Sequence, residues 1–397
     1  MFGQWESDNH SGILCRIVPW GARPNAFKKG NYMPELLKNK YNEETIRELA
    51  RRIQAVYHPF QAEDFVRSVM DGTWESLELK ARMRQIAVNL GNYLPAGYEQ
   101  ALGVLDQVAA GYPEGFNDFT LMYFPDFVEV YGQDERHWDL SMAALERYTV
   151  FSSSEFAVRP FIIRHEARMM EQMSAWAGHA NEHVRRLASE GCRPRLPWGQ
   201  SLPRFQKDPS PVLGILEQLK ADPSLYVRKS VANNLNDISK THPELVAGIA
   251  KGWYGRDART DWIVKHGCRT LLKKGNREVM DLFGFAAPDR VKVYGFALGA
   301  ASVAIGQEMT FSFTVETEAA AKVRLEYGID YRKANGRQSR RIFQISELSF
   351  KEHTKKAYTK NHSFADVSTR KHYPGPHSVT LIVNGTERGT LNFEVLA

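Results

Sequence analysis

A short unit that opens a helix recurs in the middle of this chain. The stretch Asn181–Ala188 reads NEHVRRLA, and Ser224–Val231 repeats its form as SLYVRKSV, each after a short polar turn. Asp261–Gly267, which reads DWIVKHG, is a weaker third copy. A unit of this size cannot bury its apolar face alone, so its recurrence constrains the chain to a stack of similar helical units.

The form of the unit is a turn followed by V-R-(R/K) at the start of an amphipathic helix. It is typical of HEAT-like helical pairs, whose period is about 40–47 residues and which stack into a superhelix with a concave face. Apolar residues also recur at three- and four-residue spacing through residues 31–285, as at Ile46, Leu49 and Ile53. We therefore predict an all-α domain in which the valines of the unit pack in the core. The basic side chains are expected to point out from the groove wall.

The apolar pattern changes in the last quarter of the chain. Met309–Glu316 and Lys322–Tyr327 alternate between apolar and polar residues, which indicates β-strands. Two further alternating segments flank Asn384-Gly385, a pair that favours the type I′ turn of a hairpin. Several short strands in succession predict an immunoglobulin-like β-sandwich that needs no disulfide.

These patterns divide the chain into three stretches. Residues 1–30 keep no period, and we expect an irregular leader there. Residues 31–287 are predicted to form the helical repeat domain and residues 288–397 the β-domain. The predicted fold class is mainly α, a HEAT-like α-helical repeat superhelix followed by a C-terminal immunoglobulin-like β-sandwich.

The charge of the chain is small in total but uneven along its length. The 397 residues include 52 Lys and Arg against 46 Asp and Glu, which gives a net charge of +6. Residues 288–397 hold 16 basic and 11 acidic residues, and residues 185–207 hold six basic residues and one acid. Each of these two zones carries a charge of +5, which permits a polyanionic partner.

Several classes of protein are excluded by what the sequence lacks. It has no apolar run of about 18 residues, as a membrane span would need. Three scattered cysteines fit neither a disulfide framework nor a metal knuckle, and they favour a soluble protein of the reducing cytoplasm. His165-Glu166 begins like a zinc-binding HExxH motif but lacks its second histidine. From the residues alone, a helical-repeat scaffold that binds nucleic acid or protein is favoured over an enzyme.

Several segments, in order along the chain, resemble a single family. They are Ser154–Ile162, Asn181–Gly191, Arg193–Gly199, Val227–Ile238 and Lys240–Pro243. The pattern resembles the HEAT-like repeat alkylpurine DNA glycosylases, in the AlkC branch, over roughly residues 35–285. The β-domain resembles an immunoglobulin-like appendage that some members of this branch carry.

The resemblance implies a repair enzyme that acts on double-stranded DNA containing alkylated bases. Such an enzyme hydrolyses the N-glycosidic bond of cationic bases such as 3-methyladenine. It is monofunctional, uses no metal or organic cofactor, and does not flip the base into a deep pocket. We expect the protein to be monomeric and cytoplasmic.

Glu155 is the catalytic carboxylate that the resemblance implies. Related glycosylases place a carboxylate four residues after an aromatic side chain on one helical face, and Phe151 and Glu155 have that spacing. A carboxylate at the sugar would stabilise the oxocarbenium cation and orient water. Since Ser152, Ser153 and Ser154 can cap a helix, we predict Glu155 in its first turn, where the helix dipole favours the ionised form. The alternative is that Glu155 only binds backbone amides at the helix start.

Two groups of residues are predicted to bind DNA. The basic residues of the repeated units are expected at phosphates, with surface charge or an ion pair within the repeat as the alternative. These residues are Arg185, Arg186, Arg228 and Lys229. The stiff segment at residues 193–199 is expected to probe a DNA groove, or else it caps the core with its tryptophan buried. Its candidate contacts are Arg193, Arg195 and Trp198.

Further candidates for DNA binding follow from their position. Arg159, near a helix start, is expected to touch phosphate or to pair with a carboxylate. Asn233 and Asn236 stand where related glycosylases contact the lesion strand, and the alternative is that they cap neighbouring backbone. Arg340 and Arg341 belong to a basic stretch of the β-domain that could grip DNA or simply face solvent. Phe151 is the predicted aromatic contact.

Two other functions remain open from the sequence. A non-catalytic helical-repeat scaffold would bind DNA in a salt-sensitive way and release no base. A helical-repeat module for protein interactions would have no meaningful affinity for duplex DNA at moderate salt. Analysis of the bases released from methylated DNA separates these functions from a glycosylase.

Overall fold

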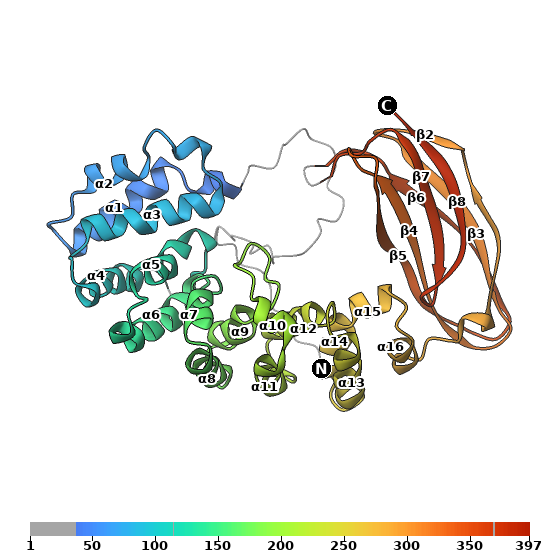
Figure 1. The fold of residues 1–397 in the computed structure, drawn as a ribbon, viewed down its shortest axis with the longest axis horizontal. Coiled ribbons are helices and arrows are strands. Elements are labelled where there is room, and N and C mark those ends of the chain that lie inside the picture. The colour runs from blue at the N-terminus through green and yellow to red at the C-terminus, as the bar shows by residue number, and fades with distance from the viewer. Residues whose placement is uncertain (1–36, 114, 368–369) are drawn as a thin grey trace, which may run out of the picture.

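The computed structural model describes residues 37–113, 115–367 and 370–397 of the chain. The predicted leader at residues 1–30 lies outside the described residues. Helices form the first part of the molecule and strands the second (Figure 1), which confirms the predicted fold class. The α-helices are α1 (Glu43–Val56), α2 (Ala62–Val69), α3 (Leu79–Tyr93), α4 (Tyr98–Ala110), α5 (Tyr123–Tyr131), α6 (Trp138–Phe151), α7 (Val158–Arg164), α8 (Glu166–Ala177), α9 (Glu182–Gly191), α10 (Pro203–Lys207), α11 (Ser210–Leu219), α12 (Leu225–Ile238), α13 (Pro243–Trp253), α14 (Ala258–Gly267), α15 (Arg269–Lys273) and α16 (Arg277–Leu282). Short 3-10 helices occur at Leu37–Lys40, Trp74–Ser76, Phe119–Met122, Glu135–His137 and Pro288–Arg290.

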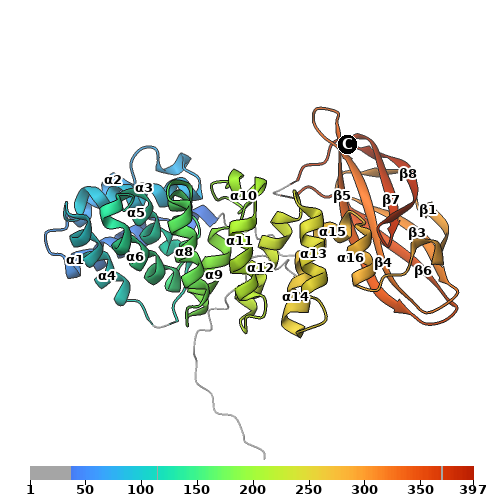
Figure 2. The same cartoon turned by 60° about the horizontal axis from the view of Figure 1, so that its bottom comes forward.

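The helices stack as an inner and an outer layer. Helices α9, α12 and α14, which carry the three copies of the repeated unit, pack side by side, and α8 packs against α11 behind them. The stack bends into an arch in Figure 1, with α8, α11 and α13 on its convex side. Figure 2 brings that convex side forward and shows the helices following one another toward the β-domain. All three copies of the unit therefore lie in the inner layer.

The inner helices begin where the repeated unit predicts. The side chain of Asn181 caps α9 by accepting a hydrogen bond from the amide two residues on (2.8 Å), and Ser224 caps α12 in the same way (3.2 Å). Val184 and Val227, the valines of the unit, are fully buried. Burial of each valine contributes about 1.5–3 kcal/mol to stability. The unit therefore sets both the start of each helix and the face that it buries.

The β-domain is a sandwich of two sheets, with strand orders β1-β3-β6 and β2-β8-β7-β4-β5. Its strands are β1 (Val291–Leu298), β2 (Ser302–Ala304), β3 (Glu308–Thr317), β4 (Ala321–Arg332), β5 (Gln338–Phe350), β6 (Thr354–Ser363), β7 (Gly375–Val383) and β8 (Thr386–Leu396). The alternation predicted for β3 is confirmed, because Phe311 and Phe313 are buried while the residue between them is exposed. Asn384 and Gly385 form the predicted β7–β8 turn with φ values of +46° and +78°, as a type I′ turn requires.

The same β7–β8 turn joins the two parts of the molecule. A Cβ atom on Gly385 would lie 2.4 Å from the Cα atom of Gly275, which follows α15, so this close approach requires glycine. The amide of Ala286 donates to the carbonyl of Lys322 (3.1 Å), and the Asn384 side chain donates to the carbonyl of Ala286 (2.8 Å). Contacts that involve the backbone therefore hold the β-domain against the end of the helical stack.

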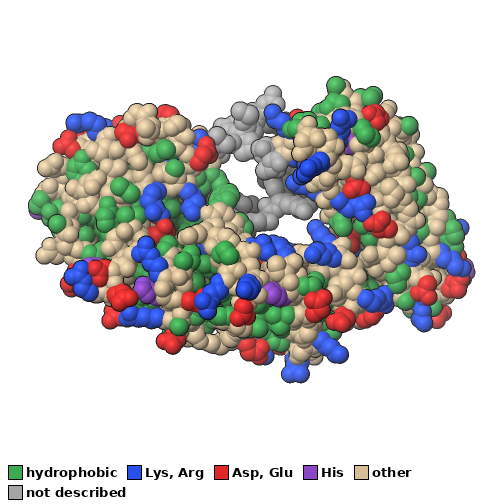
Figure 3. All heavy atoms as spheres, in the orientation of Figure 1, with side chains coloured by type: hydrophobic (Ala, Val, Ile, Leu, Met, Phe, Trp, Pro, Cys, Tyr) green, Lys and Arg blue, Asp and Glu red, His purple; other side chains and the backbone are tan. Residues whose placement is uncertain are grey.

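The helical stack and the β-domain border a hollow. In Figure 3 the helices form its floor and the β-domain forms one wall, and Lys and Arg side chains lie on both. No helix of the described residues is long and apolar enough to cross a membrane. Within the same residues, no group of three or more His, Cys, Asp and Glu side chains is placed to hold a metal ion.

Candidate active site

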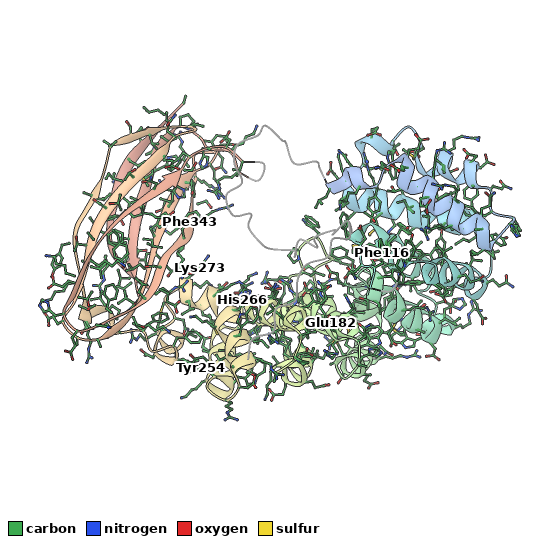
Figure 4. All side chains as sticks on the ribbon, turned by 180° about the vertical axis from the view of Figure 1, so that it is seen from behind. Phe116, Glu182, Tyr254, His266, Lys273 and Phe343 are labelled. Atoms are coloured by element: carbon green, nitrogen blue, oxygen red, sulfur yellow. The ribbon has the colours of Figure 1, made fainter. Side chains whose placement is uncertain are left out.

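The second basic position of the repeated unit faces the hollow. Figure 4 shows His266, which holds this position in the third copy, on the side of the stack toward the hollow, and Tyr254 on the opposite side. Because α9, α12 and α14 pack side by side, Arg186 and Lys229 occupy the equivalent place in the other two copies. These three side chains form a line along the floor of the hollow.

The first basic position of the unit holds the turns between helices. Arg185 donates to two carbonyls of the turn before α9 (3.0 and 2.7 Å), and Arg228 donates to two carbonyls of the turn before α12 (2.7 and 2.8 Å). Arg185 also forms a bidentate ion pair with Asp222 in the next turn (2.6 and 3.1 Å). The expected phosphate contacts of Arg185 and Arg228 are therefore corrected, because their guanidinium groups satisfy carbonyls that the turns leave unpaired.

Glu155 lies in a turn between two helices and not in the first turn of one. Helix α6 ends at Phe151 and α7 begins at Val158, so Phe151 and Glu155 do not share a helical face, and that prediction is wrong. The helix ends because the backbone of Ser152 (φ −147°, ψ −132°) is not helical. The hydroxyl of Ser153 donates to Glu155 Oε2 (2.9 Å), so a side chain rather than a helix start holds the carboxylate.

Phe151 packs in an aromatic cluster. Its ring centroid lies 5.7 Å from that of Phe124, 5.8 Å from that of Tyr148 and 6.3 Å from that of Tyr112. The half-buried ring of Phe151 packs against the core, and its contact with DNA stays a prediction. Phe116 (Figure 4) extends this cluster toward solvent. Its ring centroid lies 5.2 Å from that of Tyr112, and its side chain is 37% exposed.

Glu155 and Arg186 form a nearly buried ion pair. Arg186 Nη1 contacts Glu155 Oε2 and also donates to Ser153 Oγ (2.9 Å). The ring of Tyr226 lies 5.2 Å from the guanidinium group. Burial by itself would lower the pKa of Arg186, but Glu155 and Glu190 raise it above its ordinary value, so Arg186 stays charged. The alternative of an ion pair is therefore what the structure shows for Arg186, and its contact with phosphate stays a prediction.

One oxygen of Glu155 is left open. The contacts from Ser153 and Arg186 both go to Oε2, and no group of residues 37–113, 115–367 or 370–397 donates a hydrogen bond to Oε1. The alternative in which Glu155 binds helix-start amides is therefore not what the structure shows. A carboxylate with one fixed and one open oxygen can stabilise a nearby cation and hold a water molecule.

The loop after α9 is anchored by Arg159. This arginine is fully buried, donates to the carbonyl of Gly191 (2.8 Å) and contacts the carbonyl of Gln200 at the other end of the loop. Burial lowers the pKa of Arg159 to about 10, so it remains protonated at neutral pH. Its predicted contact with phosphate or a carboxylate is wrong, because the loop encloses the guanidinium group.

The same loop also carries an exposed aromatic side chain. Trp198 is 54% exposed with φ +62°, and its carbonyl accepts a hydrogen bond from Lys80 Nζ (2.9 Å). The alternative with Trp198 buried is wrong, and Leu196 packs into the core in its place. Arg193 pairs with buried carboxylates and is 7% exposed, so its predicted groove contact is corrected. Arg195 forms no ion pair with any described residue, and its Nε is buried without a hydrogen-bond partner.

The floor of the hollow beyond Glu155 keeps an uncompensated positive charge. Lys229 forms no ion pair within the described part of the chain. Burial, Arg269 and Lys229 lower the pKa of His266 to about 4, so this histidine is neutral at pH 7. Of the second basic positions in α12 and α14, only Lys229 is therefore charged at neutral pH.

The two predicted asparagines bind neighbouring protein groups. Asn233 Oδ1 accepts from Arg269 Nη2 (2.9 Å). Asn236 Oδ1 accepts from the amide (3.2 Å) and the hydroxyl (2.8 Å) of Thr270 at the start of α15. The phosphate contact expected of Asn236 is corrected, because the alternative of a backbone cap is what the structure shows.

The two predicted arginines of the β-domain differ. Arg340 forms a bidentate ion pair with Asp330 (2.9 and 2.8 Å) and contacts Glu387, so its charge is already paired, and its contact with DNA stays a prediction. Arg341 is exposed and forms no ion pair with a described residue. Of this basic stretch, Arg341 keeps its charge available.

Three residues that contact the ion pair of Glu155 or its neighbour Phe156 were not predicted from the sequence. Glu190 follows Arg186 by four residues, a spacing that pairs side chains on a helix and that could have indicated it. Tyr226 directly precedes the valine of the second repeated unit, and its exposure (39%) marks an unusual aromatic position. Lys80, whose Nζ lies 4.4 Å from the ring of Phe156, comes from α3 and leaves no local signal.

Two separate segments of the chain match known protein families. Residues 142–280 match the family model described as DNA alkylation repair enzyme, and residues 292–397 match that of the C-terminal Ig-like domain of the uncharacterised protein YhaZ. The uncharacterized protein YhaZ of Bacillus subtilis (strain 168) is 46% identical over 359 residues, which cover 90% of this chain and 99% of YhaZ.

A solved structure matches over nearly the same length. It is the Pseudomonas fluorescens alkylpurine DNA glycosylase AlkC bound to DNA containing an abasic site analog. The match has a TM-score of 0.86 and 38% sequence identity, and it covers 91% of this chain and 100% of AlkC. These matches confirm the resemblance seen in the sequence, and the chain belongs to the DNA alkylation repair enzyme family, in the branch of AlkC.

Proposed function

We propose that this protein is a monofunctional DNA glycosylase that hydrolyses the N-glycosidic bond of cationic alkylated bases, such as 3-methyladenine, in double-stranded DNA. The observation that carries the proposal is Glu155, a nearly buried carboxylate with one oxygen fixed and the other open. The similarity to AlkC over 91% of the chain supports the same chemistry.

The chemistry needs little more than a well-placed negative charge. An alkylated purine that already carries positive charge is a good leaving group, so no strong general acid is required. As the bond breaks, the sugar becomes an oxocarbenium cation, which a carboxylate stabilises electrostatically. In this proposal Glu155 Oε1 faces the sugar and orients the attacking water, as a carboxylate does in glycoside hydrolysis.

Duplex DNA would occupy the hollow and contact its remaining cations. Among the predicted basic residues, Lys229, Arg195 and Arg341 have neither an ion pair nor a side-chain hydrogen bond to described residues. Their contacts to phosphate would position the duplex. Trp198 is an exposed aromatic side chain on the loop after α9, and in this proposal it probes a groove of the duplex.

Replacing the carboxylate by its amide tests the proposal. Glu155→Gln keeps the shape and hydrogen-bonding capacity of the side chain but removes its charge. We expect the variant to bind DNA as the wild type does and to release 3-methyladenine from methylated DNA at least about 100-fold more slowly. Glu171→Gln, on the exposed face of α8, is the matched control and should release bases at the wild-type rate.

The same assay separates the other functions. Full activity of Glu155→Gln would overturn the role of Glu155. A wild-type protein that binds DNA in a salt-sensitive way and releases no base would be a scaffold. A wild-type protein without affinity for duplex DNA at moderate salt would be a protein-interaction module.

A further inference from the structure

Behind Glu155, charged side chains of alternating sign continue into the helical stack. We call these six residues the charge row, and in order they are Glu155, Arg186, Glu190, Arg193, Asp237 and Lys240. After the first pair, the successive nitrogen–oxygen distances are 3.5, 2.6, 2.9 and 2.9 Å. The first five side chains are 2–14% exposed, and only Lys240, at 41%, reaches the surface. The row therefore leads from the open carboxylate through two repeats.

Buried charges of this kind persist only when each is paired, because removing them from water is costly. Arg186 is the shared member, since it contacts Glu155 on one side and Glu190 on the other. A guanidinium group has five N–H donors, so it can also donate to Ser153 while Tyr226 covers its face. Its position is therefore determined from several directions at once.

Glu190 is charged and anchored from its far side. Burial alone would raise the pKa of Glu190, but Arg186 and Arg193 hold it below its ordinary value, so the carboxylate is ionised at neutral pH. Arg193 is in turn fixed by Asp237 (2.9 Å). Glu190 thus opposes the attraction that Glu155 exerts on Arg186.

We propose that Glu190 is a positioning residue that acts on Glu155 through Arg186, an inference that rests on the proposed function of Glu155. With Glu190 in place, Arg186 holds Oε2 and leaves Oε1 open. Without Glu190, Arg186 would pair with Glu155 alone. Its positive charge would then reduce the negative potential that Glu155 creates at the sugar. A misplacement of about 1 Å can slow a reaction about 100-fold, even when the mutated residue is remote from the chemistry.

The variant Glu190→Gln removes the charge and keeps the shape. We expect single-turnover release of 3-methyladenine, at saturating protein, to slow about 10- to 100-fold. Affinity for DNA that contains an abasic-site analogue should change less than about threefold, because Glu190 does not touch the DNA in this proposal. Arg186→Lys should retain more activity than Arg186→Met, since lysine keeps a positive charge beside Glu155.

The control is another buried ion pair next to the row. Asp222 pairs with Arg185 (2.6 Å; 3% and 14% exposed) and contacts no member of the charge row. Asp222→Asn should lower the melting temperature while the release rate of the folded protein stays within about twofold of the wild type. If Glu190→Gln slows release no more than Asp222→Asn does, Glu190 is merely structural and the inference is wrong.

A double mutant tests the route through Arg186. If Glu190 acts only through Arg186, then Glu190→Gln combined with Arg186→Met should be no slower than Arg186→Met alone, within about threefold. Additive losses would overturn the inference. Should Glu190→Gln not fold, Glu190→Asp provides the same test, because it keeps the charge but shortens the reach to Arg186.

The outcome is distinguishable from failure of the proposed function. An inactive Glu155→Gln with a fully active Glu190→Gln refutes the positioning role and leaves the glycosylase intact. An active Glu155→Gln refutes the catalytic role of Glu155, and the positioning role with it.

Discussion

The first two copies of the repeated unit share a backbone but differ in the surroundings of their second basic residue. In α9, Arg186 lies between Glu155 and Glu190, and its charge is taken up by carboxylates. In α12, Lys229 has the uncharged Asn233 one helical turn later, where α9 has Glu190, and it forms no ion pair with a described residue. The repeat therefore sets where the side chain points, and the residue one turn later decides whether its charge is available.

The largest effect should come from the first basic position of the two copies. Arg185→Met would leave the carboxylate of Asp222 buried without its partner, so we expect a loss of about 3–5 kcal/mol in the free energy of unfolding. Arg228→Met would leave only two carbonyls unpaired, and we expect a loss of about 1–3 kcal/mol. Urea denaturation followed by circular dichroism measures both values.

A reversed order would break the comparison. If Arg228→Met destabilised the protein as much as Arg185→Met, the Arg185–Asp222 pair would add nothing to the common carbonyl contacts. Arg51→Met, on the exposed face of α1, is the matched control and should change the free energy of unfolding by less than about 0.5 kcal/mol.

The fold could be predicted from local patterns because each pattern has a local cause. The period of apolar residues, the caps at Asn181 and Ser224 and the Asn384-Gly385 turn act within a few residues of each other. The junction between the two parts could not be found in this way. It depends on the approach of Gly275 to Gly385, more than a hundred residues later in the chain.

The site was predicted less completely, for the same physical reason. Glu155 was proposed from a family motif, but the ion-pair partner of its carboxylate, Arg186, comes from a separate helix. The spacing of Phe151 and Glu155 suggested one helical face, and the non-helical backbone of Ser152 breaks it. An arginine in sequence shows its charge but not its partner, so the paired and unpaired arginines could not be told apart.

A smaller effect is expected at the second basic position of α12. Lys229→Met should weaken DNA binding about 3- to 10-fold. Because one phosphate contact is lost, the slope of log affinity against log salt concentration should become about 0.9 less steep. Base release at saturating protein should stay at the wild-type rate, in contrast to substitution of Arg186. Fluorescence anisotropy over a salt series measures the slope.

The outer helix α13 supplies the control for this measurement. Lys251→Met removes the same charge from an exposed position on α13 and should leave the slope unchanged. An unchanged slope for Lys229→Met would mean that an unpaired charge on the floor of the hollow is not a DNA contact. The two copies would then differ only in the ion pair that Arg186 forms, and not in DNA binding.

The smallest effect is expected at the third copy, where Lys265 holds the first basic position. Its Nζ lies 2.6 Å from Glu347 of β5, but the lysine side chain is 49% exposed, so the pair contributes at most about 1 kcal/mol. Glu347 also keeps Arg324 at 3.3 Å, so Lys265→Met leaves no buried carboxylate unpaired. Urea denaturation should show a loss below about 1 kcal/mol in the free energy of unfolding. Small-angle scattering should show an unchanged shape, because the contact between Gly275 and Gly385 still holds the β-domain. A changed scattering profile would mean that this one ion pair, rather than the backbone contacts, sets the angle between the helical stack and the β-domain.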